Sequence, residues 1–228
     1  MRPTSKKLLL AASLILIVSY FVPIWEISLV APQYPEGLGL EIWIDTIDGQ
    51  NPHDLDKVNN LNHYIGMKEI VPEAIPELKI MPYLIGFMIL FGLLAVFTGK
   101  RALLYTWTVV FIIIGIVGMV DFYLWEYDYG HNLNPDAAIK IPGMSYQPPL
   151  IGSKQLLNFV AISLPGIGGY AIIGSILLGL IASILQFKTP KSGKQNNETV
   201  KNTSGNDTAN PDPAAKLHTR STADPLRA

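Results

Sequence analysis

The sequence predicts a membrane α-helical protein, with four transmembrane helices and an extracytoplasmic α+β cap. Of the 228 residues, 49% are hydrophobic and only 15% are charged, which is too apolar for an ordinary soluble domain. A helix needs about 20 apolar residues to cross a bilayer. Four runs without any charged residue meet that length: residues 8–25, 81–98, 102–120 and 155–187.

The first 25 residues predict an N-terminal transmembrane anchor. Arg2, Lys6 and Lys7 precede the apolar run, which suits either an anchor or a cleaved signal peptide. No good small-x-small cleavage site follows the run closely, since residues 29–31 come late. We therefore favour an uncleaved anchor over a signal peptide.

Residues 26–80 predict a folded strand–helix segment outside the membrane. Aliphatic residues alternate with polar or aromatic ones in a pattern typical of a half-buried strand: Leu38, Leu40, Ile42 and Ile44. A short helix is expected next, with Asn51 as its N-terminal cap and Pro52 at the first helical position. Gly66 is expected to be its left-handed C-terminal cap.

The remaining chain divides into four parts. Residues 81–120 predict a transmembrane hairpin, and residues 121–156 an outer loop rich in proline, glycine and aromatic residues. Residues 157–187 predict the fourth transmembrane helix. Its outer half contains Pro165 and several glycines, which indicates close helix packing or, alternatively, a hinge or ligand cleft. The polar residues 188–228 predict a disordered cytoplasmic tail.

Charge sets the orientation of these segments. The N-terminus, the turn at residues 99–101 and the segment after residue 187 are basic, so the positive-inside rule places them in the cytoplasm. Residues 26–80, with ten acidic and three basic residues, then lie outside together with residues 121–156. We expect a multi-pass protein of a bacterial inner membrane with both termini cytoplasmic.

No catalytic motif is present, so we do not expect an enzyme. The chain has no cysteine, which excludes disulfides and thiolate metal sites. Imidazole and thioether groups remain, and these soft donors suit copper. The candidate metal ligands in the outer segments are two histidines and two methionines: His63, Met67, His131 and Met144.

Other roles for these residues stay open. Methionine near a membrane boundary often only packs, and a histidine at a helix end often only bonds a carbonyl group. His53 stands beside an acidic residue at a helix start, where we expect it to be solvated. For Asp121, Glu126 and Asp128 we expect a solvated rim, with attraction of cations as the alternative.

Four stretches carry a family resemblance: residues 31–38 (APQYPEGL), 59–68 (NNLNHYIGMK), 121–133 (DFYLWEYDYGHNL) and 142–159 (PGMSYQPPLIGSKQLLNF). They resemble a family of bacterial four-helix membrane proteins encoded near nitrous-oxide reductase and its copper-maturation factors. The resemblance spans about residues 5–187. It implies a role in copper-enzyme maturation or in denitrification more broadly, but it supplies no ligand set.

We therefore expect an accessory membrane protein that binds or relays copper at its outer face for nitrous-oxide reductase maturation. Its expected surroundings are the lipid bilayer and its expected partners are periplasmic or membrane maturation proteins, with no nucleic acid. The alternative is a metal-free scaffold that docks such a partner or a transporter through Trp43, Tyr64 and the proline-rich edges. A subunit that handles quinone or electrons is disfavoured, since no paired histidines lie within the helices.

Overall fold

Four long apolar helices dominate the computed structural model, which describes residues 1–32, 34–156 and 158–187. Within these residues, each of the four is long and apolar enough to cross a membrane. They are α1 (Pro3–Ile15) continued by the 3-10 helix η1 (Leu16–Tyr20), α3 (Pro76–Thr98), α4 (Arg101–His131) and α5 (Ile167–Phe187). The predicted tail, residues 188–228, lies outside the described residues.

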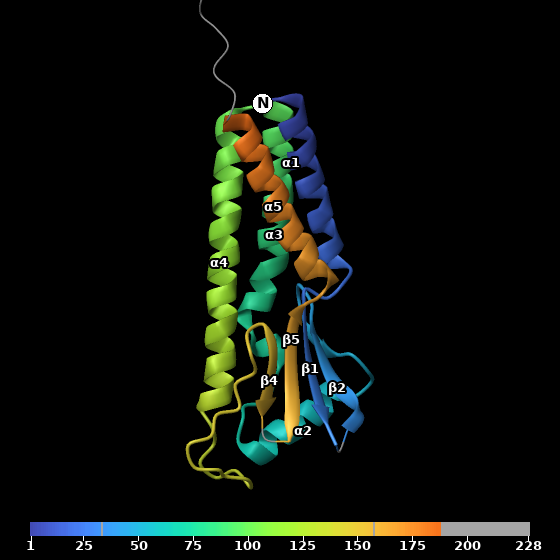
Figure 1. The fold of residues 1–228 in the computed structure, drawn as a ribbon, viewed down its shortest axis with the longest axis vertical. Helices are drawn as coiled ribbons and strands as arrows, with labels where there is room; N and C mark the ends of the chain where they lie inside the picture. The colour runs from blue at the N-terminus through green and yellow to red at the C-terminus, as the bar shows by residue number, and fades with distance from the viewer. Residues whose placement is uncertain (33, 157, 188–228) are drawn as a thin grey trace, which may run out of the picture. The chain divides into compact units, whose positions relative to one another are not determined.

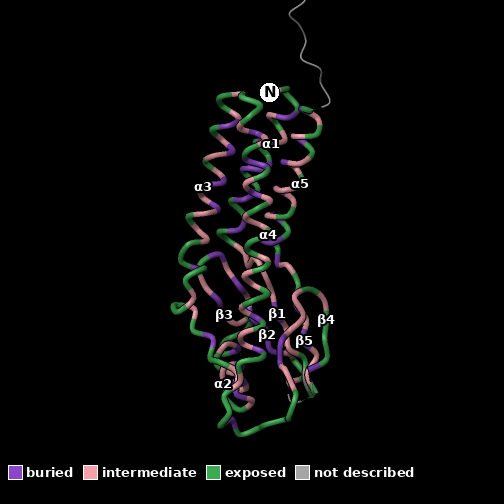
Figure 2. The backbone as a smooth tube through the Cα atoms, turned by 90° about the vertical axis from the view of Figure 1, so that its left-hand side faces the viewer, coloured by how far each residue is buried: buried purple, intermediate pink, exposed green. Residues whose placement is uncertain are grey.

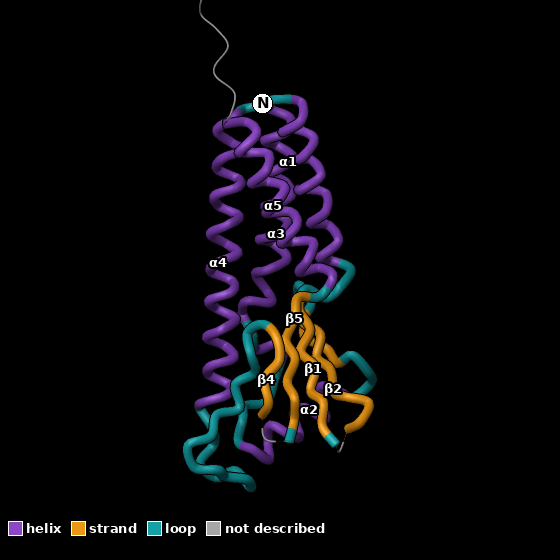
Figure 3. Tube along the Cα trace, in the orientation of Figure 1, coloured by secondary structure: helices purple, strands orange, loops and turns teal. Residues whose placement is uncertain are grey.

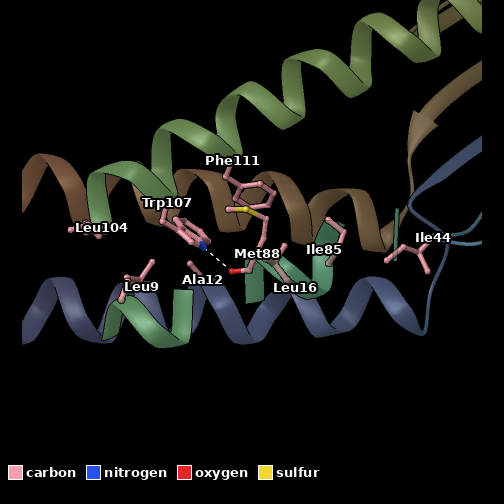
Figure 4. Close-up of a cluster of buried hydrophobic side chains, with 11 residues drawn as sticks. Leu9, Ala12, Leu16, Ile44, Ile85, Met88, Leu104, Trp107 and Phe111 are labelled. Carbon is pink, nitrogen blue, oxygen red and sulfur yellow. Dashed lines mark hydrogen bonds between the residues drawn. The ribbon is translucent and has the colours of Figure 1, made fainter. Parts of the chain in front are cut away.

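The helices pack around a buried tryptophan. α1 and α4 each contact both α3 and α5 (Figure 1). Trp107 of α4 is fully buried, and its Nε1 donates a hydrogen bond to the Met88 carbonyl of α3 at 2.8 Å (Figure 4). A β-carbon on Gly179 of α5 would lie 2.5 Å from the indole ring. Glycine at this position therefore allows the tryptophan to reach the helix backbone.

The glycines at the start of α5 also permit close contact. A β-carbon on Gly169 would lie 2.2 Å from the Ile24 carbonyl oxygen, and the Gly168 N–H donates to the Pro23 carbonyl at 2.9 Å. Farther along α5, the Ser175 hydroxyl donates to the Ala12 carbonyl at 2.7 Å. Close packing, the first of the two predicted roles for this segment, accounts for these small residues.

A five-stranded antiparallel sheet and a short helix lie at one end of the helices (Figures 1 and 3). The strands follow the order β3-β2-β1-β5-β4. Their bounds are β1 (Trp25–Ala31), β2 (Tyr34–Ile42), β3 (Ile47–Gly49), β4 (Gly152–Leu156) and β5 (Phe159–Pro165). The short helices are α2 (Asp54–Ile65) and the 3-10 helix η2 (Pro72–Ala74). We call the strands, α2, η2 and residues 121–151 the cap.

The strand predicted from alternating aliphatic residues is confirmed. Leu38, Leu40 and Ile42 of β2 are buried in the core of the cap. Ile44, which continues the alternation beyond the end of β2, packs with the helices instead. The sequence pattern therefore marks both the strand and the point where the cap meets the helices.

The fourth membrane helix starts later than predicted. Residues 159–165 form β5, not the first turns of a helix, and α5 begins only at Ile167. β5 lies between β1 and β4, so an uncharged strand is covered by a neighbour on each edge. Hydropathy alone cannot separate such a strand from a membrane helix. Pro165 ends β5 and therefore does not bend α5.

Helix α4 runs farther than predicted. Residues 121–131 continue the helix instead of opening a loop. Phe122, Trp125 and Tyr129 recur at helical spacing and pack against the core of the cap. The same turns bury further positions, as the burial colours along α4 show (Figure 2). We take residues 101–120 as the apolar part of α4 and residues 121–131 as part of the cap.

Two of the three basic segments, the N-terminus and the turn at residues 99–101, lie together at the other end of the helices. The Arg2 backbone N–H donates to Gln186 Oε1 at 2.7 Å, which joins the start of α1 to the end of α5. A β-carbon on Gly99, in the turn between α3 and α4, would lie 3.1 Å from Lys6 Nζ. The N-terminal basic segment and the turn at residues 99–101, both assigned to one side by the positive-inside rule, are thus neighbours, away from the cap (Figure 1). The third basic segment, after residue 187, lies outside the described residues.

Candidate functional site

The N-terminal end of α2 is held by a buried carboxylate. The helix begins at Asp54, two residues later than predicted, and its cap is His53 in the left-handed conformation (φ 68°) in place of Asn51. Asp54 accepts hydrogen bonds from the backbone N–H of Gly39 and from the backbone and side chain of Asn51. Because this carboxylate binds both the turn before α2 and strand β2, it sets where the helix starts.

The C-terminal end of α2 is fixed by Gly66. Its φ of 82° confirms the predicted left-handed cap. The loop that follows α4 docks on this end: the Asn134 N–H donates to the Gly66 carbonyl at 2.7 Å, and the Ile139 N–H donates to the Tyr64 carbonyl at 2.9 Å. The two predicted outer segments therefore meet directly at the end of α2.

Replacing Gly66 with alanine is expected to lower the free energy of unfolding by about 2–4 kcal/mol, from left-handed strain and overpacking together. The new β-carbon would lie 2.9 Å from Ala137 Cβ and 3.0 Å from the Asn134 carbonyl oxygen. Gly143→Ala is the matched control, because Gly143 has a similar φ of 76° but open space around it. Urea unfolding in detergent micelles measures both, and equal losses would show that the contact with the loop contributes nothing.

His63 and Met67 line a common pocket of about 220 Å³. The other lining residues are Asn59, Asn60 and Glu69. His63 is exposed on the last turn of α2, and Met67 follows Gly66 and is half-buried. The left-handed turn at Gly66 thus leaves His63 and Met67 in the lining of one pocket. We call this the His63 pocket.

The other two predicted ligands lie elsewhere. His131 ends α4, where its ring stacks on Tyr127 at a centroid distance of 4.0 Å and its Nδ1 lies 3.0 Å from the Tyr127 carbonyl oxygen. Met144 is half-buried in the loop before β4. Neither residue belongs to the lining of the His63 pocket. In the described part of the chain, no three His, Cys, Asp or Glu side chains gather as a metal site.

The rim of the cap carries a long-range ion pair. Lys68 Nζ lies 2.5 Å from Asp128 Oδ2, which joins the segment after α2 to α4. The hydrogen bonds from Lys68 and Asn132 hold the pKa of Asp128 below its usual value. Asp128 is therefore ionised and paired near the His63 pocket, and its side chain is 41% exposed, which agrees with the solvated rim expected from the sequence.

A second pocket, of about 100 Å³, lies between the sheet, α2 and α4. Its walls are mostly aliphatic and aromatic, but Glu126 and Tyr146 also line it. Glu126 is 0% exposed, and neither of its carboxyl oxygens has a hydrogen-bond partner in the described structure. The buried Tyr146 hydroxyl has none either. We call this the Glu126 pocket; Met67 lines it as well as the His63 pocket.

Burial raises the pKa of Glu126 from 4.5 to about 8, although the nearby charge of Lys154 lowers it somewhat. The carboxyl group is therefore mostly protonated at neutral pH. The prediction of a solvated rim residue is wrong for Glu126. The informative signal was the spacing of Glu126 from its aromatic neighbours. Glu126 lies four residues after Phe122, directly after Trp125 and three residues before Tyr129, and it therefore falls on the apolar face of α4.

Known proteins give no further guide to these pockets. Comparison with models of protein families finds no match to the chain, and comparison with curated proteins finds none.

Proposed function

We propose that the chain is a multi-pass membrane accessory protein that binds or relays copper at the outer face of its cap for the maturation of nitrous-oxide reductase. The observation that carries the proposal is the common pocket of His63 and Met67. The role is non-catalytic, and the partners are membrane or periplasmic proteins of the same maturation process.

The donors of this pocket fit copper. A thioether is a soft ligand that selects Cu(I), and an imidazole binds copper in either oxidation state. His63 and Met67 would hold the ion, and Glu69 also belongs to the lining of this pocket. Copper is the cargo in this proposal. The role of the chain is to hold the bound ion at an exposed position, from which the ligands of a partner protein can take it.

Topology and sequence resemblance add support to the proposal. The N-terminal basic segment and the turn at residues 99–101 lie together at the end away from the cap, and α5 ends there too, which suits an inner-membrane orientation with both termini in the cytoplasm and the cap in the periplasm. The resemblance to a family encoded near copper-maturation factors is the reason for proposing copper as the metal and nitrous-oxide reductase as the enzyme served.

Cu(I) titration against a competing chelator tests the site. We expect His63→Ala/Met67→Ala to weaken binding by at least about tenfold, since even the loss of an outer partner of a metal ligand has that effect. His53→Ala is the matched control, because His53 is an exposed histidine at the other end of α2. Equal affinity and stoichiometry in the double variant and the wild type would contradict the proposal.

His131→Ala/Met144→Ala separates a two-residue site from the four-ligand site expected from the sequence. Because neither residue lines the His63 pocket, we expect this variant to bind Cu(I) like the wild type. A loss equal to that of the His63/Met67 variant would restore the four-ligand set. The readout is the same chelator competition.

The alternative is a metal-free scaffold. Tyr64, beside His63, exposes 55% of its surface and offers an aromatic contact to a partner. Capture of a maturation protein that persists in the presence of a strong copper chelator and is lost in Tyr64→Ala would favour the scaffold. Capture that requires copper would favour the relay.

A further inference from the structure

We propose that the Glu126 pocket is a binding site for a small uncharged molecule with an apolar body and a hydroxyl or carbonyl group. Nothing in the proposal requires a metal, although Met67 lines both this pocket and the His63 pocket. It stands on the coincidence of an apolar cavity with two buried polar groups that lack a protein partner.

Buried polar groups in folded proteins are nearly always hydrogen-bonded, and the exceptions often mark functional sites. Glu126 and Tyr146 come from different parts of the chain, α4 and the loop before β4, yet both line one cavity. The pairing is held by the backbone, since the Tyr146 N–H donates to the Gly130 carbonyl at 2.9 Å. A β-carbon on Gly130 would lie 2.4 Å from the Gln147 nitrogen, so glycine permits this close approach.

The cavity walls indicate an apolar body. Strands β1 and β5 contribute Leu29 and Phe159, and α2 contributes Leu61 and Ile65. An apolar cavity of about 150 Å³ holds benzene. The roughly 100 Å³ of this pocket therefore suits a molecule of about five heavy atoms, or the tip of a longer one.

The polar groups indicate an uncharged head. A protonated carboxyl group and a tyrosine hydroxyl can each donate and accept a hydrogen bond, which matches an alcohol or a carbonyl compound. The positive charge of Lys154 lies near enough to influence Glu126 and so disfavours a cationic ligand. An anion would lose its hydration in this pocket, because the described lining residues are mostly apolar and include no cationic side chain to pair with it.

Methionine-methyl NMR of the protein in lipid nanodiscs tests the proposal without copper. Met67 lines the pocket, whereas Met119 is half-buried in the apolar part of α4 and reports partition into the bilayer. We expect 1-butanol to shift the Met67 signal saturably, and butylammonium and butyrate to do so at least about tenfold more weakly. A Met67 shift that is linear and parallel to that of Met119, or none at all, would mean that the pocket does not bind the alcohol and would overturn the proposal.

Three variants identify the head contact. Glu126→Gln keeps a donor and an acceptor and should bind 1-butanol within about threefold of wild type, whereas Glu126→Leu should lose about tenfold, the value of one hydrogen bond. Glu73→Gln, an exposed carboxylate outside the pocket, should change nothing. Equal binding by Glu126→Leu and Glu126→Gln would overturn the assigned role of Glu126. The methyl spectrum itself reports whether each variant is folded.

Discussion

Glu126→Gln is expected to remove a large pH dependence from the stability of the protein. In the wild type, burial raises the pKa of Glu126 from 4.5 to about 8, so the folded state holds its proton more tightly than the unfolded state. Stability relative to the Gln variant is therefore greatest below pH 4.5, falls as the pH rises and levels off above about 8. At about 1.36 kcal/mol per pKa unit, the whole change is on the order of 5 kcal/mol.

The comparison isolates Glu126 from the ionisable groups nearby, because the wild type and Glu126→Gln share them unchanged. These groups are Tyr129 and Tyr146 in the pocket lining and Lys154 of β4. Urea unfolding from pH 4 to pH 9 in detergent micelles gives the comparison, with Glu73→Gln as the exposed control. Parallel stability curves for the wild type and Glu126→Gln would show that Glu126 does not titrate in a buried site.

Asp54→Asn is expected to cost about 3 kcal/mol of unfolding free energy, because a buried charged acceptor loses several donors at once. Asp54 is 1% exposed and accepts hydrogen bonds from Gly39, Asn51 and Lys57. Burial alone would raise the pKa of Asp54, but these hydrogen bonds outweigh it and lower the pKa. The stabilisation is thus present above the ordinary value of 3.8 and is lost as the pH falls through the lower value of the folded state.

Asp56→Asn is the matched control, two residues along the same helix. Its side chain is 75% exposed and pairs with His53, whose side chain is 80% exposed, so we expect a change within about 0.5 kcal/mol. Urea unfolding at pH 7 compares the two variants. Similar losses in both would show that the contacts between Asp54 and β2 do not hold α2 on the sheet.

Local chemistry made part of the cap predictable. Gly66 followed a helical stripe and preceded a change of pattern, and the left-handed cap forms there. The alternation of Leu38, Leu40 and Ile42 likewise predicted the buried face of β2. In each case a few neighbouring residues contain the whole signal, because backbone conformation or strand alternation decides the outcome.

Tertiary contacts decided what the sequence left undetermined. β5 is a strand because β1 and β4 pair with both of its edges, a fact that its uncharged sequence does not contain. Helix α4 continues to His131 because Phe122, Trp125 and Tyr129 pack against the buried residues of the cap. Glu126 belongs to the same face, and its burial follows from that packing.

The candidate metal site shows the same division. His63 and Met67 lie on either side of the left-handed Gly66, and both line one pocket. Local backbone geometry is enough to bring these two residues together. The placement of His131 and Met144 depends on how α4 and its following loop dock, and no short pattern specifies that. The four-ligand set is therefore a weaker prediction than the pair.

Copper K-edge X-ray absorption of the Cu(I)-loaded protein tests the central claim most directly. The wild type should show sulfur together with nitrogen around the metal, Met67→Leu should remove the sulfur, and Met144→Leu should leave it in place. Retention of the sulfur signal in Met67→Leu, or its absence from the wild type, would contradict copper binding at the His63 pocket.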